Sequence, residues 1–169
     1  MSMHALSALP DDARLWLLAL EPAPDAAAQA RLGEAMDALV SEWRHKGVAY
    51  QGAWTLLEGR ILLLAEPTMT TAPSGCAIDG MMRKVDRLVA GLDLAMVDPT
   101  AAVFVRLAEG LRAIPKAELE ARLADGTLDA ATPVLDLSLF TLGDLRAGKL
   151  EKPLASTWIG RKYKVATMA

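Results

Sequence analysis

The chain has 169 residues, of which 53% are apolar, and a formal net charge of −3 with acidic and basic residues interspersed. This length fits one domain with a sizeable core, and no apolar run is long enough to span a membrane. A single cysteine excludes an internal disulfide and a multi-cysteine zinc site, so we expect no structural metal and no cofactor. We find no concentrated basic face for nucleic acid and no secretory signal before Pro10, and therefore expect a cytoplasmic protein.

Hydrophobic periodicity and turn residues predict a regular order of elements within residues 1–112. In chain order we expect a strand, a helix, two strands, a helix and a strand, at residues 14–20, 24–47, 48–57, 60–66, 76–92 and 102–107. Gly47 suits the end of the first helix because it accepts a left-handed backbone, and Glu58-Gly59 suits a tight hairpin turn. The order β-α-β-β-α-β is typical of a ferredoxin-like antiparallel sheet with two helices on one face.

The remaining residues, 113–169, show a weaker pattern. Here we expect a short helix, a strand, a second short helix with Thr141 as its N-cap, and an irregular tail, at residues 115–123, 134–139, 141–146 and 149–169. The tail should pack through apolar residues such as Leu154 and Trp158. We therefore predict one domain, 1–169, with residues 113–169 as an α/β elaboration on a core formed by 1–112.

The only cysteine, Cys76, lies at the predicted start of the second helix and off its apolar stripe. A thiol there is exposed to the positive end of the helix dipole and to unpaired amides, which both favour the thiolate. Gly75 lets the backbone approach closely, and this combination suits a reactive thiol or an anion site. In the alternative interpretation Cys76 is a small apolar residue that closes the helix start, and Asp79 caps the first turn.

A thiol nucleophile needs a base, and His45 is the best available candidate because the two long helices of the predicted fold run antiparallel. The competing interpretation of His45 is a plain charge near the end of the first helix. An anion would find hydroxyl and amide donors in the loop before the second helix, and the tail could fold over the site. The predicted ligand-binding residues are Thr70, Thr71, Ser74, Gly75, Asp79 and Trp158.

Gly75 and Gly80 have the spacing of a G-x-x-x-x-G phosphate-binding loop. Met81 and Met82, however, follow where a nucleotide site needs Lys and then Ser or Thr. The sequence therefore excludes ATP hydrolysis by such a loop and leaves other enzyme activity open.

Three segments together resemble a known family. They are Trp43-Arg44-His45-Lys46-Gly47, Ser74-Gly75-Cys76-Ala77-Ile78-Asp79 and Ser156-Thr157-Trp158. In this order they are similar to segments of a family of small bacterial proteins, best known from Bacteroidetes, with an S/T-G-C-S/A-I-D motif. Its members have no established activity, although they are often labelled "ABC transporter ATPase". The resemblance implies that Ser74, Gly75, Cys76 and Asp79 are motif positions.

Two functions of different class follow. The first is binding of a small molecule or anion at the N-terminus of the second helix, with Cys76 as the reactive or contacting residue. The second is a non-enzymatic interaction or self-assembly module, for example a homo-oligomer, in which Cys76 is structural.

Overall fold

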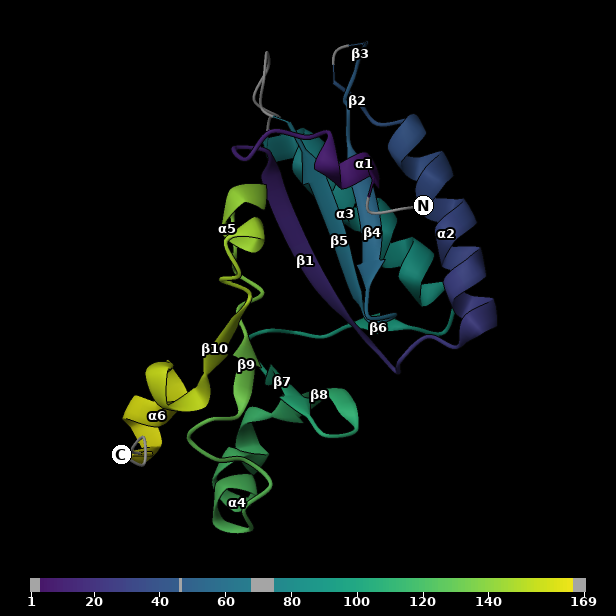
Figure 1. Cartoon of the computed structure of the whole chain (residues 1–169). Coiled ribbons are helices and arrows are strands. Elements are labelled where there is room, and N and C mark those ends of the chain that lie inside the picture. The colour runs from purple at the N-terminus through teal and green to yellow at the C-terminus, as the bar shows by residue number, and fades with distance from the viewer. Residues whose placement is uncertain (1–3, 46, 68–74, 166–169) are drawn as a thin grey trace. The chain divides into compact units, whose positions relative to one another are not determined.

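The computed structural model describes residues 4–45, 47–67 and 75–165, with only the backbone described for His4, Ala5, His45, Val48, Cys76 and Ala77. The chain is a mixed α+β protein (Figure 1) that divides into two compact units. Unit 1 comprises Met1–Met96 and Ser138–Ala147, and unit 2 comprises Val97–Leu137 and Gly148–Ala169. Each unit has its own four-stranded antiparallel sheet.

Unit 1 is built on a sheet with the strand order β4-β5-β1-β6. Strands β1 and β5 pair from Arg14 opposite Glu66 to Ala19 opposite Ile61. Strand β4 pairs with the other side of β5, and the short β6 pairs with the end of β1. The strands are β1 (Arg14–Glu21), β4 (Ala53–Leu57), β5 (Ile61–Glu66) and β6 (Ala95–Met96).

Two long helices, α2 (Ala26–Ser41) and α3 (Gly75–Ala90), pack on one face of this sheet. Side chains alternate along a strand, so the even-numbered positions of β1 and β5 share the helix-covered face. The core there includes fully buried leucines, each of which contributes roughly 1.5–3 kcal/mol by leaving water. Its members from strands and helices include Leu20, Leu62, Leu64, Leu32, Met36, Val85 and Val89.

Short elements complete unit 1: α1 (His4–Ser7), the hairpin β2 (Arg44–His45) and β3 (Val48–Ala49), and α5 (Leu142–Arg146). The segment Ser138–Ala147, which contains α5, belongs to unit 1 because its backbone forms hydrogen bonds with the start of β1. The amide of Leu15 donates to the carbonyl of Phe140, and the amide of Leu142 donates to the carbonyl of Ala13, both at 2.9 Å.

Unit 2 has the strand order β10-β9-β7-β8. Its strands are β7 (Ala102–Leu107), β8 (Gly110–Pro115), β9 (Pro133–Leu135) and β10 (Glu151–Pro153). Its helical segments are η1 (Lys116–Glu118), α4 (Leu119–Ala124), η2 (Leu154–Ser156) and α6 (Trp158–Tyr163). Its core is separate from that of unit 1 and includes Val105, Leu119, Leu128, Leu154 and Ile159.

The predicted helix 24–47 is too long. It ends at Ser41, and the chain reverses after Trp43, where the amide of Tyr50 donates to the Trp43 carbonyl at 2.9 Å. Gly47 does have a positive φ of 84°, but in the β2–β3 hairpin and not at a helix end. Packing between Trp43 and Tyr50 overrides the helical periodicity here, and the predicted strand 48–57 is consequently split into β3 and β4.

The predicted fourth strand of the first sheet, residues 102–107, belongs instead to unit 2 as β7. It forms a hairpin with β8, which the sequence analysis missed, and the place beside β1 is taken by the two-residue β6. The prediction of an irregular tail at 149–169 is also wrong, because β10 and α6 form there. Such short strands carry too little periodicity to be seen without their partners.

Local turn and cap predictions are confirmed. Glu58 and Gly59 form the hairpin turn between β4 and β5, with φ values of 49° and 65°. Thr141 caps α5, since its side chain accepts from the amide of Asp144. Leu154 is fully buried as expected, whereas Trp158 is 39% exposed.

We predict that Gly160→Ala destabilises unit 2. A Cβ at this buried position in α6 would lie 2.3 Å from the carbonyl oxygen and 2.6 Å from the Cα of Ala155, and backbone cannot move aside easily. We expect the free energy of unfolding to fall by about 1–3 kcal/mol or more, as measured by urea unfolding. Gly80→Ala in α3 is the matched control, because a Cβ at Gly80 meets no described atom within 4 Å. This substitution should raise the free energy of unfolding by roughly 0.5–1 kcal/mol. Equal midpoints for both variants would contradict this packing of α6.

Candidate functional site

The structure describes only some of the site residues predicted from the sequence, and these lie in different elements. Thr70, Thr71 and Ser74 lie outside the described residues. Gly75 is the first residue of α3 and Cys76 the second, and only the backbone of Cys76 is described. Where a Cβ on Gly75 would lie, no described atom comes within 4 Å, so the described part of the chain leaves this side of the helix start open.

The other predicted residues lie in different elements. Asp79 is exposed in α3, and His45 is the second residue of β2, described by its backbone alone. Trp158 belongs to α6 of unit 2, where the Nζ atoms of Lys116 and Lys162 lie 5.4 and 6.0 Å from its ring centroid. The functional roles assigned to these three residues stay predictions.

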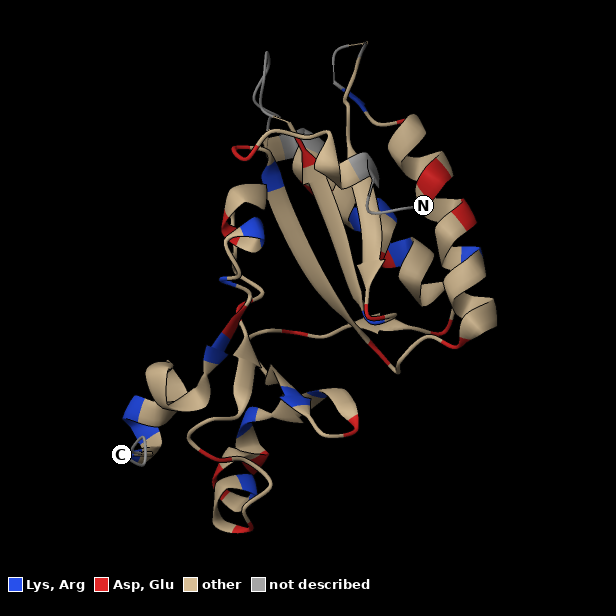
Figure 2. Cartoon of the chain, viewed as in Figure 1, with Lys and Arg blue, Asp and Glu red and all other residues tan. Residues whose placement is uncertain are grey.

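A group of buried and half-buried polar and aromatic side chains lies at one end of the unit 1 sheet. Arg14 and Glu66 are opposite each other at the last position of the β1–β5 pairing, on the face that carries the helices. Figure 2 shows that charged residues of unit 1 lie mainly on helices and turns, so charges in these strands stand out. We name Arg14, Trp16, Trp43, Tyr50 and Glu66 the Glu66 cluster.

Ring contacts connect the members of the Glu66 cluster. Trp43 makes edge-to-face contacts with Trp16 and Tyr50, with ring centroids 6.0 and 5.0 Å apart. The guanidinium carbon of Arg14 lies 5.3 Å from the ring centroid of Trp16 and 4.8 Å from that of Phe140. Trp43 and Tyr50 are buried, and these rings keep water away from the polar atoms between them.

Glu66 has the most perturbed carboxyl in this cluster. It is 2% exposed, and burial raises its pKa from 4.5 to about 7, although the positive charge of Arg14 acts in the opposite direction. Burial and then the negative charge of Glu66 raise the pKa of Tyr50. Near neutral pH, Glu66 is therefore present in both its protonated and its ionised form.

Polar atoms of the cluster are buried without a hydrogen-bond partner among the described residues. They include Oε2 of Glu66, Nε of Arg14 and Nε1 of Trp43. Each buried polar group without a partner lowers the stability of the folded state by about 1–3 kcal/mol, so its presence calls for an explanation. Arg14 and Trp43 can only donate, whereas Glu66 donates when it is protonated and accepts when it is ionised.

The Glu66 cluster and the start of α3 lie at the same end of the sheet. Figure 1 shows the first turn of α3 near the start of β1 and the end of β5. Helix α2 runs back to this end as well, because Trp43 follows two residues after its last residue, Ser41. The end of the sheet beside the start of α3, where Cys76 lies, thus carries a second set of chemically notable residues.

Sequence reasoning missed Arg14 and Glu66. The available signal was a charged residue at the border of each apolar run, Leu15 to Leu20 and Ile61 to Ala65. A charged residue at such a border is equally typical of a strand end that is exposed to solvent. Only the β1–β5 register shows that the two charges face each other under the helices.

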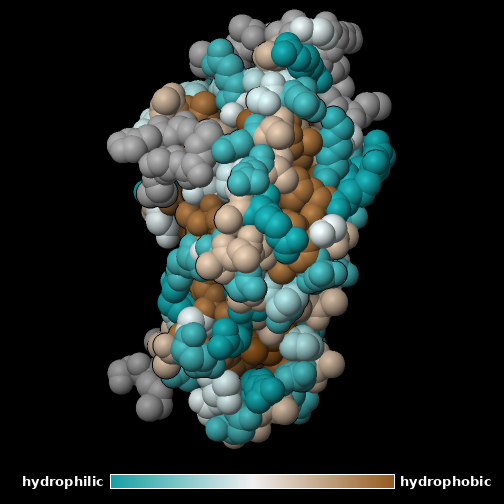
Figure 3. Space-filling model, turned by 90° about the vertical axis from the view of Figure 1, so that its right-hand side faces the viewer, coloured by the Kyte–Doolittle hydropathy of each residue, from teal (hydrophilic) through white to brown (hydrophobic). Residues whose placement is uncertain are grey.

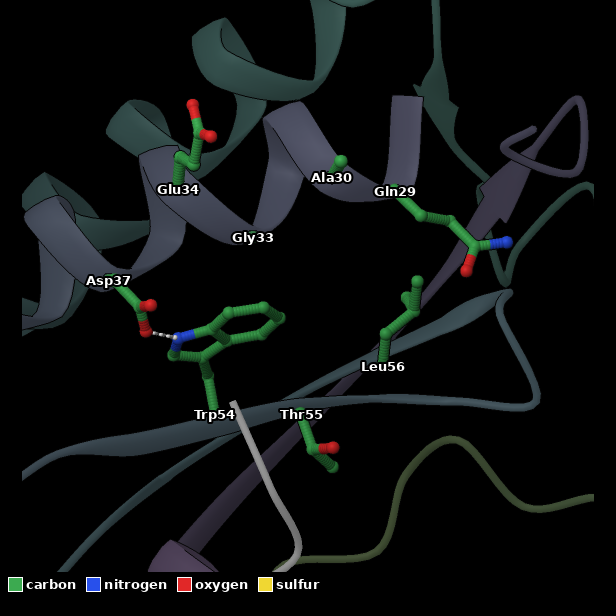
Figure 4. A pocket seen from close by; sticks show the side chains of 8 residues that line it. All are labelled: Gln29, Ala30, Gly33, Glu34, Asp37, Trp54, Thr55 and Leu56. Atoms are coloured by element: carbon green, nitrogen blue, oxygen red, sulfur yellow. Dashed lines mark hydrogen bonds between the residues drawn. The ribbon is translucent and has the colours of Figure 1, made fainter. Parts of the chain in front are cut away.

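Unit 1 also contains a cavity of about 390 Å³ between α2 and β4. Figure 4 shows the ring of Trp54 beside α2, with its Nε1 donating to Oδ1 of Asp37 at 2.8 Å. This cavity shares no lining residue with the Glu66 cluster. It is lined by Gln29, Ala30, Gly33, Glu34, Asp37, Trp54, Thr55 and Leu56.

Comparisons with known proteins add no family. No family model matches the chain, and no match is found among curated proteins or solved structures. Across the described ranges, no three or more His, Cys, Asp or Glu side chains group in a way that would suit a metal ion. No helix in those ranges is long and apolar enough to cross a membrane.

We predict that Glu66 makes the stability of unit 1 fall as pH rises. Its folded pKa of about 7 lies above the ordinary 4.5, so the folded state holds the proton more tightly. The stabilisation is complete below about pH 4.5 and is lost as the pH rises through 7, by at most roughly 3 kcal/mol. Glu66→Gln cannot ionise, and its advantage over the wild type in urea unfolding should grow between about pH 5 and pH 8. The exposed Glu34→Gln is the control, and parallel stability curves for wild type and Glu66→Gln would contradict the burial of this charge.

Proposed function

We propose that unit 1 binds a small anion or carbonyl compound at the end of its sheet, beside the start of α3. The observation that carries this proposal is the carboxyl of Glu66. It is 2% exposed, and one of its oxygens has no hydrogen-bond partner in the described part of the chain. Two buried donors, on Arg14 and Trp43, belong to the same cluster and are likewise unpaired there.

The chemistry of these donors favours an oxygen acceptor. The guanidinium of Arg14 supplies a positive charge, the indole of Trp43 supplies a neutral donor, and protonated Glu66 supplies a third. The start of the 16-residue α3 adds the positive end of a helix dipole. Aromatic rings beside the donors suit a flat apolar body, so the ligand class we favour is a small monocarboxylate such as an aromatic acid.

Cys76 takes the role of a contacting or reactive residue in this proposal. As the second residue of α3 it lies where the helix dipole lowers a thiol pKa. We favour Glu66 over His45 as the group that exchanges a proton at this site, because the carboxyl has a pKa near neutrality and known buried surroundings.

Three further assignments are proposals of the same kind. The strand order β4-β5-β1-β6 with α2 and α3 on one face supports a ferredoxin-like classification of unit 1, with β6 as its fourth strand. The segment Ser74-Gly75-Cys76-Ala77-Ile78-Asp79 supports membership of the Bacteroidetes-type family described above. A cytoplasmic location is consistent with the single cysteine.

Benzoate tests the binding proposal through tryptophan fluorescence. We expect its affinity for the wild type to fall about tenfold between about pH 6 and pH 8, because the protonated fraction of a group with a pKa near 7 falls by that factor. Glu66→Gln keeps a donor at all pH values, so it should bind benzoate with an affinity that does not change with pH. Trp43→Phe keeps a ring but loses the donor and should weaken binding about fivefold.

Benzyl alcohol, a neutral analogue without a carboxylate, is the ligand control. It should bind at least about tenfold more weakly than benzoate and without pH dependence. Absence of benzoate binding at millimolar concentration by fluorescence and by NMR would overturn the proposal. A monomer–dimer equilibrium in the same samples would instead favour the self-assembly module.

Alkylation by iodoacetamide tests the role of Cys76, which is the only thiol in the chain. The helix dipole predicts an apparent pKa below the ordinary value of about 8.5 and protection by bound benzoate. Denatured protein, in which the helix is absent, supplies the reference rate. An apparent pKa at or above about 8.5, with no effect of benzoate, would rule out a reactive or contacting thiol.

A further inference from the structure

We propose that the cavity between α2 and the edge strand β4 is a second binding site, for a small organic cation with an apolar body. It has a volume of about 390 Å³, within the range of roughly 300–1,000 Å³ typical of ligand sites. The proposal goes beyond the anion site, because the two sites share no residue and prefer ligands of opposite charge.

The charge at the cavity comes from two carboxylates of α2. Glu34 and Asp37 are one turn apart on the helix, and both are exposed to solvent. Neither forms an ion pair with a basic side chain in the described part of the chain. A cation in the cavity would therefore meet two unneutralised negative charges and would not have to displace a protein cation.

The aromatic wall of the cavity is held in place by one of these carboxylates. Oδ1 of Asp37 accepts from Nε1 of Trp54 at 2.8 Å, which fixes both side chains (Figure 4). A carboxylate has further acceptor capacity, so Asp37 can bind an ammonium group while it keeps the indole. Trp54 is 4% exposed, so only a small part of its ring borders the cavity, and the two carboxylates supply the attraction for the cation.

Small residues on α2 let the helix pack closely on the ring. A Cβ on Gly33 would lie 3.7 Å from Cη2 of Trp54, an ordinary contact distance, and Ala30, one turn away, adds only a methyl group to the cavity wall. Leu56 supplies apolar surface at the other end of the cavity (Figure 4). Figure 3, viewed from the side of α2, shows hydrophobic residues at the surface between hydrophilic ones. Within the cavity, an apolar body attached to the cation would lie against Leu56 and Trp54.

Phenethylamine and its neutral analogue 2-phenylethanol form the pair of probes. Because only the amine can use the carboxylates, we expect it to bind about tenfold more tightly at low salt, measured by NMR titration of backbone amides. The difference should shrink as salt is added, since both carboxylates are exposed. The largest chemical-shift changes should fall on residues 29–37 of α2 and 54–56 of β4.

Variants that remove the negative charges of the cavity distinguish an effect of charge from an effect of structure. Asp37→Asn retains an oxygen that accepts from the indole, and Glu34→Gln retains the side-chain length. Together they should reduce phenethylamine affinity about tenfold, while the urea midpoint falls only slightly, because a neutral acceptor replaces a charged one in the bond to Trp54. Glu42→Gln, the same charge change at an exposed position outside the cavity, should have no effect on binding.

Several results would overturn the cation site. They are absence of phenethylamine binding at millimolar concentration, equal affinity for 2-phenylethanol, and shift changes centred away from α2 and β4. Because benzoate is expected at the Glu66 cluster, which shares no residue with the cavity, failure of one probe leaves the outcome for the other unaffected.

Discussion

The antiparallel pairing of β1 with β5 is the constraint on which unit 1 depends. It runs from Arg14 opposite Glu66 to Ala19 opposite Ile61 and places the two most apolar strands at the centre of the sheet. A shift of one residue would turn Leu62 and Leu64 away from α2 and α3 and lose the core. The same register carries Arg14 and Glu66 onto the helix-covered face. The apolar core thus determines where the polar end of the sheet lies.

That polar end is energetically unfavourable for folding alone. Glu66 is buried deeply enough for its pKa to reach about 7, and Arg14 opposes this shift without restoring an ordinary pKa. Perturbed pKa values cluster at functional sites, and Glu66 combines such a value with an unpaired oxygen among the described residues. The position of α3 adds a helix start to the same end, and this convergence gives the proposed anion site its physical basis.

The two sites that we propose for unit 1 differ in electrostatic character. At the end of the sheet the unpaired atoms lie on two donors and on the carboxyl of Glu66, whereas beside the edge strand β4 the carboxylates of Glu34 and Asp37 have no basic partner among the described residues. Helix α2 is close to both. Trp43 of the Glu66 cluster follows two residues after the end of α2, and residues 29–37 of the helix line the cavity.

The sequence by itself determined the elements with strong local signals. The amphipathic stripe of α3, the cap at Thr141 and the turn at Glu58-Gly59 all follow from side-chain periodicity and backbone preferences that need no partner. Cys76 could likewise be assigned to a helix start from its neighbours alone. Only the tertiary structure decided that residues 102–107 join a second sheet, that the chain reverses at Trp43, and that Arg14 faces Glu66. The physical reason is that strand pairing and ring packing join residues far apart in the chain, and a local pattern does not encode which partner each strand finds.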